Sequence, residues 1–295
     1  MASATKTRGM RVAALLALSV PLACGVRAAR TLRIELASAH PPRIEVQAPA
    51  KVLPGLEVQE VKFPTDDGLT LEGWLVPSKN GAAVVLVHGY GSNREALAFE
   101  AQALVARGFG VLLIDLRAHG RSQGELTTYG DLERGDVRAA MKVLGLPPGR
   151  IGLLGFSMGS TAVARAAALE PHPGAVMIGG ATTSANDACD DEARVWRWLD
   201  SPISLAVMRH NGLDVQGLAV IDRLRELEGT PIFIVHGALD PLSPVLRAHQ
   251  LFEAAREPKH LLILEGAAHG HYGVTNPIEY TAAVTSFFQE ALSRP

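Results

Sequence analysis

The chain has 295 residues, of which 47% are hydrophobic and 20% are charged, and its formal net charge is -2. A chain of this length can bury a sizeable core, and α/β folds of this size often form one domain. The nearly balanced charge and the lack of a basic run argue against a nucleic-acid partner, because nothing in the sequence supplies the positive surface that phosphates attract.

The first thirty residues differ in composition from the rest of the chain. Three basic residues within the first eleven precede an apolar stretch over 12–23, and no acidic residue comes before Glu35. The stretch is shorter than the ~18 residues that a membrane-spanning helix needs. Residues 1–30 are therefore predicted to be a signal peptide or an N-terminal anchor, and the protein to be periplasmic, secreted or membrane-associated through its N-terminus.

The chain has only two cysteines, which argues against a disulfide framework or a cysteine-rich metal centre. The segment Leu22-Ala23-Cys24-Gly25 is similar to a bacterial lipoprotein cleavage site, so lipid attachment at Cys24 is an alternative to simple export. Cys189 is interpreted as a small, partly buried residue. Because the sequence contains neither a C-x-x-C nor an H-E-x-x-H motif, no metal and no cofactor are predicted.

Residues 31–57 contain four prolines and no clear period, which predicts an extended linker leading onto the edge of a sheet. The next two segments, 58–63 and 69–76, alternate apolar and polar residues. This period of two, with turn residues at 65–68 between the segments, predicts a pair of antiparallel strands.

From residue 82 onward, apolar runs alternate with helical patterns. Strands are predicted at 82–88, 231–236 and 261–264, and others begin near 110, 151 and 175; helices are predicted at 94–107, 131–144, 158–169, 244–256 and 277–293. Continuous apolar strands between helices are typical of parallel strands that are buried on both faces. The predicted fold class is α/β, with a mostly parallel central sheet and helices on both of its faces.

A stretch of about fifty residues, 181–229, interrupts this alternation where a minimal fold needs one crossover helix. We interpret it as a helical cap insert. Trp196 and Trp198 within it are predicted to form an apolar wall of a substrate pocket. The alternative is that these side chains only dock the insert onto the domain.

Ser157 has the sequence surroundings of an activated nucleophile. It lies between Gly155 and Gly159, directly after an apolar run and directly before a helical pattern. A serine on such a strand-to-helix turn has strained backbone angles, and glycines two residues away leave room for it. The N–H of Met158, at the start of the helix, is then placed to meet a developing oxyanion.

Other strand ends carry residues suited to the same chemistry. The strand at 82–88 is followed by a glycine-rich loop in which the N–H of Tyr90 is the second predicted oxyanion donor. Asp240 follows the strand at 231–236, and His269 lies in a loop of small residues after the strand at 261–264. Capping of the next helix is an alternative role for Asp240, and His271 is the alternative to His269.

The order Ser157, Asp240, His269, together with the segment 115–122, resembles the α/β-hydrolase-fold serine hydrolases of the esterase and lipase kind. The resemblance covers residues 58–295. It implies an α/β-hydrolase domain with a cap insert, in which Ser157 is the nucleophile, His269 the base and Asp240 its orienting acid. It requires neither a cofactor nor a metal.

A catalytic triad does not specify the leaving group, so the substrate stays open at this point. Hydrolysis of a small-molecule carboxylic ester is the leading hypothesis, because the predicted cap is apolar. A serine peptidase, amidase or thioesterase is one alternative, and acidic residues of the insert could then hold a substrate amine: Asp187, Asp190, Asp191 and Glu192. A catalytically silent homologue that binds a ligand in the same pocket is another.

Overall fold

One mixed sheet organises the computed structural model, which describes residues 24–183, 197–211, 219–270 and 272–293. Within these residues the strand order is β1-β2-β4-β3-β5-β6-β7-β8. β2 is antiparallel to both β1 and β4, and every other neighbouring pair is parallel. The strands are β1 (Gln59–Pro64), β2 (Thr70–Val76), β3 (Ala83–Val87), β4 (Gly110–Ile114), β5 (Ile151–Phe156), β6 (Ala175–Gly179), β7 (Ile232–Gly237) and β8 (Lys259–Leu264).

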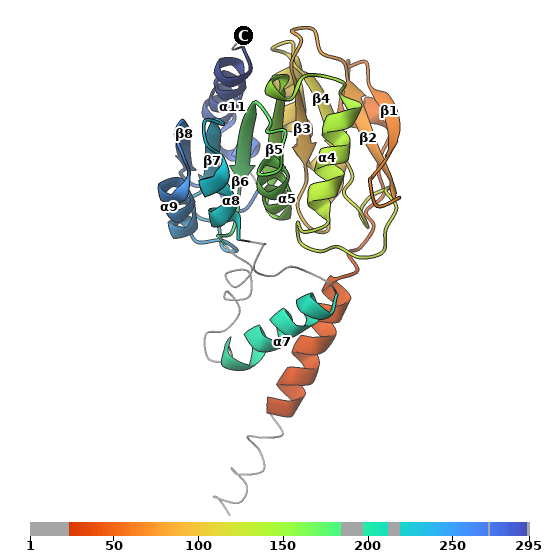
Figure 1. The fold of residues 1–295 in the computed structure, drawn as a ribbon, viewed down its shortest axis with the longest axis vertical. Coiled ribbons are helices and arrows are strands. Elements are labelled where there is room, and N and C mark those ends of the chain that lie inside the picture. Colours follow the sequence, from red (N-terminus) through yellow and green to blue (C-terminus); the bar gives the residue numbers. More distant parts are fainter. Residues whose placement is uncertain (1–23, 184–196, 212–218, 271, 294–295) are drawn as a thin grey trace, which may run out of the picture.

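Helices cover both faces of the sheet (Figure 1). One face packs against α4 (Glu133–Val143), α5 (Met158–Ala167), α8 (Val220–Glu226) and α9 (Val245–Ala254). The other packs against α3 (Ala98–Val105), α10 (Tyr272–Thr275) and α11 (Pro277–Leu292). Shorter elements are α2 (Pro49–Val52) and the 3-10 helices η1 (Arg94–Leu97) and η2 (Pro148–Arg150).

The central strands β3, β4 and β6 are buried at every position, as their unbroken apolar sequences require. Two apolar cores result, one on each face of the sheet. The predicted fold class is confirmed, and the parallel strands all end at one edge. The residues that follow those strands are therefore gathered at that edge.

The predicted extended linker is wrong in its first part. Residues 24–38 form one helix, and 41–48 form neither helix nor strand before α2. The helix therefore also runs through the last residues of the predicted signal or anchor segment. Residues 1–23, on which the export prediction chiefly rests, lie outside the described part of the chain. None of the described helices combines the length and the apolar character needed to cross a bilayer.

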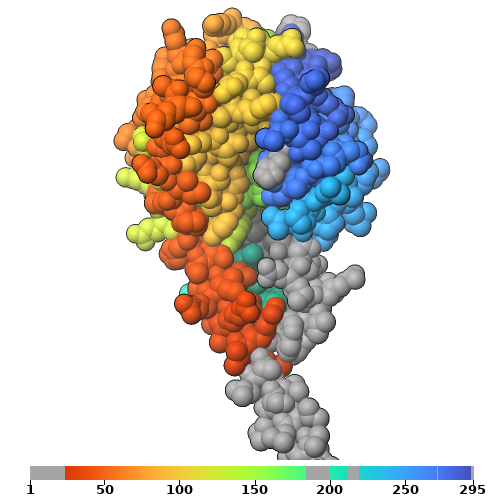
Figure 2. All heavy atoms as spheres, turned by 180° about the vertical axis from the view of Figure 1, so that it is seen from behind, coloured from red at the N-terminus to blue at the C-terminus, as the bar shows by residue number. Residues whose placement is uncertain are grey.

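A second helix, α7 (Arg197–His210), lies beside helix 24–38 beyond the edge where the parallel strands end (Figure 1). Figure 2 shows residues 24–38 at the same end of the molecule from behind. Polar contacts join the two helices: Arg27 and Thr31 both bond to Asp200, and Ser204 donates to Glu35. We call helix 24–38 and α7 together the two-helix cap.

The predicted cap insert, 181–229, is too long at its C-terminal end. Val220 and Leu224 of α8 are fully buried in the core of the main domain. α8 is therefore the crossover helix between β6 and β7, and α7 is the part of the insert that the structure describes as cap. Trp196 lies outside the described residues, and for Trp198 only the backbone is described.

Candidate active site

Ser157 lies on a sharp turn between β5 and α5. Its backbone angles, φ +52° and ψ -119°, fall in a region that residues other than glycine rarely adopt. A Cβ on Gly155 would lie 2.4 Å from the carbonyl oxygen of Gly159, and a Cβ on Gly159 would lie 2.3 Å from that of Val87. Both glycines are thus needed for the chain to pass this closely, which is the predicted reason for their spacing.

Asp240 and His269 are joined by a short hydrogen bond. The Nδ1–H of His269 donates to Oδ2 of Asp240 at 2.7 Å. The other carboxylate oxygen accepts the backbone N–H groups of Leu242 and Ser243, at 2.8 and 2.9 Å. Burial raises the pKa of Asp240, but the hydrogen bonds from His269 and the backbone outweigh it and hold the pKa below the ordinary 3.8. The carboxylate is therefore ionised at neutral pH, and its hydrogen bond to Nδ1 selects the imidazole tautomer that leaves Nε2 to accept a proton.

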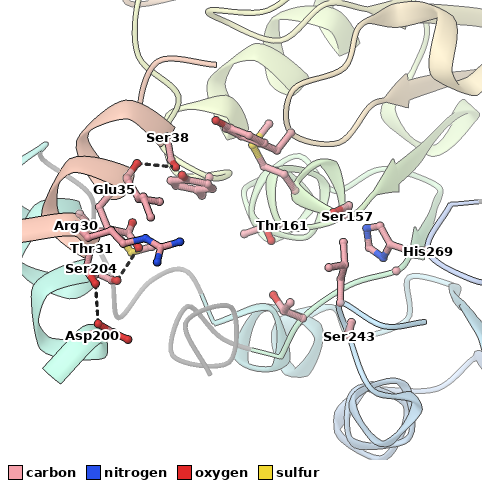
Figure 3. Close-up of a pocket in the computed structure, with 18 of the residues that line it drawn as sticks. Arg30, Thr31, Glu35, Ser38, Ser157, Thr161, Asp200, Ser204, Ser243 and His269 are labelled. Carbon is pink, nitrogen blue, oxygen red and sulfur yellow. Dashed lines mark hydrogen bonds between the residues drawn. The ribbon is translucent and has the colours of Figure 1, made fainter. Parts of the chain in front are cut away.

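Ser157 and His269 line the same cavity, and Figure 3 shows the imidazole beside the serine. Among the described residues, no hydrogen bond joins the two side chains in this structure. Catalytic hydrogen bonds of this kind are often long without substrate and tighten when it binds. His269 is further held by Phe156, whose ring centroid lies 4.8 Å from that of the imidazole.

The two predicted oxyanion donors lie around the serine. Met158 is the first residue of α5, so its N–H is one of the amides that the helix leaves unpaired. Tyr90 lines the cavity from the loop after β3. In that loop a Cβ on Gly89 would lie 3.1 Å from Cβ of Ser157, so the loop passes close against the nucleophile.

Two buried histidines hold the loop that carries Tyr90. His88 donates from Nδ1 to the carbonyl of Gly89 at 2.7 Å and accepts the N–H of Leu116 on Nε2 at 3.1 Å. His119 likewise accepts the N–H of Gly91 at 3.1 Å. Burial is the main cause that lowers the pKa of His88, to about 4, and it also lowers the pKa of His119. Both imidazoles are therefore neutral at pH 7 and shape the loop through these hydrogen bonds.

The cavity over the serine has a volume of about 510 Å³ and is largely apolar. Beside Ser157 and His269, the main domain contributes Tyr90, Tyr129, Met158, Thr161, Gly180, Thr182, Leu242 and Ser243. The two-helix cap contributes Arg27, Arg30, Thr31, Ile34, Glu35, Ser38, Asp200, Ser204 and Met208. Volumes of this order accommodate drug-sized ligands.

The contribution of helix 24–38 to the cavity was not predicted from the sequence. Its lining residues 27, 30, 31, 34, 35 and 38 recur every three or four positions, so they share one face of the helix. That spacing was available in the sequence. Most of these residues are polar, however, and a search for apolar periodicity passes over them.

The structure thus brings together five of the predicted site residues: Ser157, Asp240, His269, Tyr90 and Met158. The predicted pocket residues Trp196 and Trp198 have no described side chains, and His271 and the acidic residues of the insert lie outside the described part of the chain. No cluster of three metal-ligating side chains occurs among the described residues.

The strand order, the elbow between β5 and α5 and the residues at the strand ends define the class of protein. A model of the α/β hydrolase fold family matches residues 82–201. The chain has the α/β-hydrolase fold.

Individual relatives agree with this assignment. The Pyrococcus furiosus esterase Pf2001 superposes with a TM-score of 0.72 at 25% identity, over 86% of this chain and 99% of the esterase. The Exiguobacterium antarcticum esterase EaEST, at 18% identity and a TM-score of 0.62 over 78% of this chain and 100% of its own, shares the fold. The uncharacterized protein Rv2307c of Mycobacterium tuberculosis is 29% identical over 76% of each chain. The esterase Pf2001 supports hydrolase activity.

Proposed function

We propose that the protein is a serine hydrolase that cleaves carboxylic esters through an acyl-enzyme. One observation carries the proposal: the ionised Asp240 holds His269 by a 2.7 Å hydrogen bond at the cavity where Ser157 is presented on its strained turn. These are the geometric roles of nucleophile, base and orienting acid, arranged at the ends of different strands.

In the first half of the reaction, the hydroxyl of Ser157 attacks the ester carbonyl carbon while Nε2 of His269 takes its proton. The carbonyl oxygen becomes an oxyanion, which the N–H groups of Tyr90 and Met158 stabilise. Asp240 stabilises the imidazolium that forms. The carbon–oxygen bond to the alcohol then breaks, the imidazolium protonates the departing alkoxide, and the acyl group stays on Ser157.

In the second half, water attacks the acyl-enzyme and gives its proton to His269. The tetrahedral intermediate then collapses: the carbonyl double bond re-forms and the bond between the carbonyl carbon and the serine oxygen breaks. The serine oxygen keeps the electrons of that bond and regains its proton from the imidazolium. The carboxylic acid leaves, and the enzyme is restored. Every proton transfer in this sequence involves a group of the chain or the substrate, so no cofactor enters the proposed reaction.

An ester is favoured over an amide for two reasons. The cavity wall is mostly apolar, with aromatic and methionine side chains at Tyr90, Tyr129, Met158 and Met208, which suits an acyl or alcohol chain. The esterase Pf2001 matches nearly its whole length to this chain, and the proposal carries the ester activity of that protein to this one.

The proposal is tested with a fluorophosphonate probe and a substrate panel. The probe is expected to label the native protein and to leave folded Ser157→Ala unlabelled. In the panel, p-nitrophenyl acyl esters of increasing chain length are compared with the corresponding anilides and thioesters. We expect the highest kcat/KM for the esters. Faster turnover of anilides or thioesters would move the assignment to those classes, and an unlabelled, inactive wild-type protein would favour the silent ligand-binding homologue.

A further inference from the structure

We propose that Arg30 binds a carboxylate carried by the substrate, so that the pocket selects esters with an anionic group remote from the scissile bond. This inference rests on the ester hydrolase activity proposed above and adds a substrate class to it. It depends on how the charged side chains of the two-helix cap are paired.

Helix 24–38, which carries Arg30, is held against α7 by hydrogen bonds from two neighbours of Arg30 to Asp200. Arg27 donates to both carboxylate oxygens of Asp200, from Nε at 3.2 and 3.0 Å and from Nη2 at 2.5 Å, and Thr31 donates to the same carboxylate at 2.6 Å. The charge of the Asp200 carboxylate is thus balanced by Arg27, and both of its oxygens accept hydrogen bonds. The hydrogen bonds of Arg27 and Thr31 also hold the intervening turn, and with it Arg30, in place.

Arg30 has a different environment from Arg27. Within the described residues, none of the hydrogen bonds or ion pairs of the structure involves its guanidinium. Figure 3 shows the side chain extending from helix 24–38 into the cavity, on the side opposite Ser157 and His269. A guanidinium stays charged at all physiological pH values, and its planar donors match the two oxygens of a carboxylate.

Glu35 is the remaining charged residue on this wall and has a partner of its own. Its Oε1 accepts the hydroxyl of Ser204 at 2.6 Å. The hydroxyl occupies one oxygen without cancelling the charge, so Glu35 weakens the positive potential that Arg30 creates. A carboxylate that reaches Arg30 is therefore expected to bind more tightly when Glu35 is neutral.

The lining between Arg30 and the catalytic residues is largely apolar, with Thr161 as a polar residue in the same space (Figure 3). Tyr90 and Tyr129 stack with their ring centroids 5.7 Å apart, and Met158 and Met208 lie on the same cavity. An apolar spacer crosses such a region at little cost, whereas a charge placed there would lose its hydration. The favoured substrate thus has an ester at one end, an apolar chain and a carboxylate at the other end.

Two matched substrate pairs test which side of the ester carries the carboxylate. For the acyl side, mono-p-nitrophenyl adipate is compared with p-nitrophenyl hexanoate. For the alcohol side, p-acetoxybenzoate is compared with phenyl acetate. We expect Arg30→Gln to lower kcat/KM for the charged member of one pair by about 10-fold, mainly through KM, and to leave its neutral partner within about 2-fold. Taking ratios between wild type and variant removes differences in intrinsic reactivity.

Arg33 provides the matched control, because it is exposed on the same helix, as Arg30 is, but does not line the cavity. Arg33→Gln should leave kcat/KM unchanged for both the charged and the neutral esters. Arg30→Lys should retain part of the preference for the charged ester over its neutral partner, and Glu35→Gln should increase that preference. The inference is overturned if Arg30→Gln affects charged and neutral esters alike, or if Arg33→Gln has the same effect. Neutral esters would still be hydrolysed in that event, so the proposed ester hydrolase function would stand.

Discussion

The sheet edge with its elbow and the two-helix cap differ in how they are held. Around Ser157, backbone passes so close to backbone that Gly155 and Gly159 leave no room for a Cβ, and buried apolar strands flank the turn on both sides. The cap helices are joined to each other by polar contacts centred on Asp200 and Glu35. We therefore propose that the domain fixes the chemistry and that the cap selects the substrates that reach it.

The largest effect is expected in the domain, from Asp240→Asn. An asparagine in place of the carboxylate removes the charge that supports the imidazolium and the acceptor that fixes the tautomer of His269. We expect kcat to fall by about 10³-fold or more, with the fold retained. Steady-state kinetics with a p-nitrophenyl ester and circular dichroism provide the two measurements. A variant that retained wild-type kcat would contradict the assignment of Asp240 as the orienting acid.

Next in size is the expected loss of stability in Gly159→Ala. The added methyl group would overlap the carbonyl oxygens of Val87 and His88, at 2.3 and 2.5 Å, and neither is free to move. A destabilisation of about 3 kcal/mol is expected, at the upper end for overpacking, and is measured as a shift in the urea unfolding midpoint. As a control, Gly149→Ala adds a methyl group where nothing lies within 4 Å, and it should leave the midpoint nearly unchanged.

The buried His88 gives the domain a predicted acid sensitivity. Its pKa in the folded protein is about 4, below the ordinary 6.5, so the unfolded chain binds the extra proton first as the pH falls. Its contribution to stability is complete above pH 6.5 and is lost as the pH falls from there toward 4. At pH 5 the loss amounts to about 2 kcal/mol.

Urea unfolding at pH 7 and at pH 5 measures this loss, in wild type and in His88→Gln. The variant is expected to be less stable at pH 7 but to lose about 2 kcal/mol less on acidification. Equal losses in the two proteins would show that His88 is not the group responsible.

The smallest effect is expected in the cap. Asp200→Asn removes the ion pair with Arg27, which is partly buried and worth about 1 kcal/mol. We expect a KM for long-chain esters that is raised about 5-fold, an almost unchanged kcat, and a free energy of unfolding lowered by about 1 kcal/mol at most. Lys142→Gln removes a pair with Asp66, on exposed side chains in the main domain, and serves as the control with no effect on KM. A large fall in kcat for Asp200→Asn would mean that the cap also takes part in the chemistry.

The same contrast explains what could be predicted from the sequence. The strands and the elbow depend on local patterns: unbroken apolar runs, and glycines two residues on either side of Ser157. The strand ends that carry Asp240 and His269 follow from the same runs. Sheet order brings these distant segments together, and the resemblance to a known fold supplied that order.

The cap was predicted less well because its residues face a cavity instead of a core. Helix 24–38 presents Arg27, Thr31 and Glu35 on its inner face, so it lacks the apolar stripe that marks a helix packed on a domain. The prolines that follow it suggested an extended segment throughout. In the insert, the predicted cap includes α8, because the sequence alone does not reveal that Val220 and Leu224 pack on the sheet.

Trapping of the acyl-enzyme tests the central claim most directly. Wild-type protein is mixed with a p-nitrophenyl ester, quenched in acid during turnover and digested, and the acylated peptide is identified by mass spectrometry. We expect an acyl group on Ser157, a burst of p-nitrophenol equal to the enzyme concentration when deacylation is slower than acylation, and neither in Ser157→Ala. Acylation of a different residue, or full turnover by folded Ser157→Ala, would contradict it.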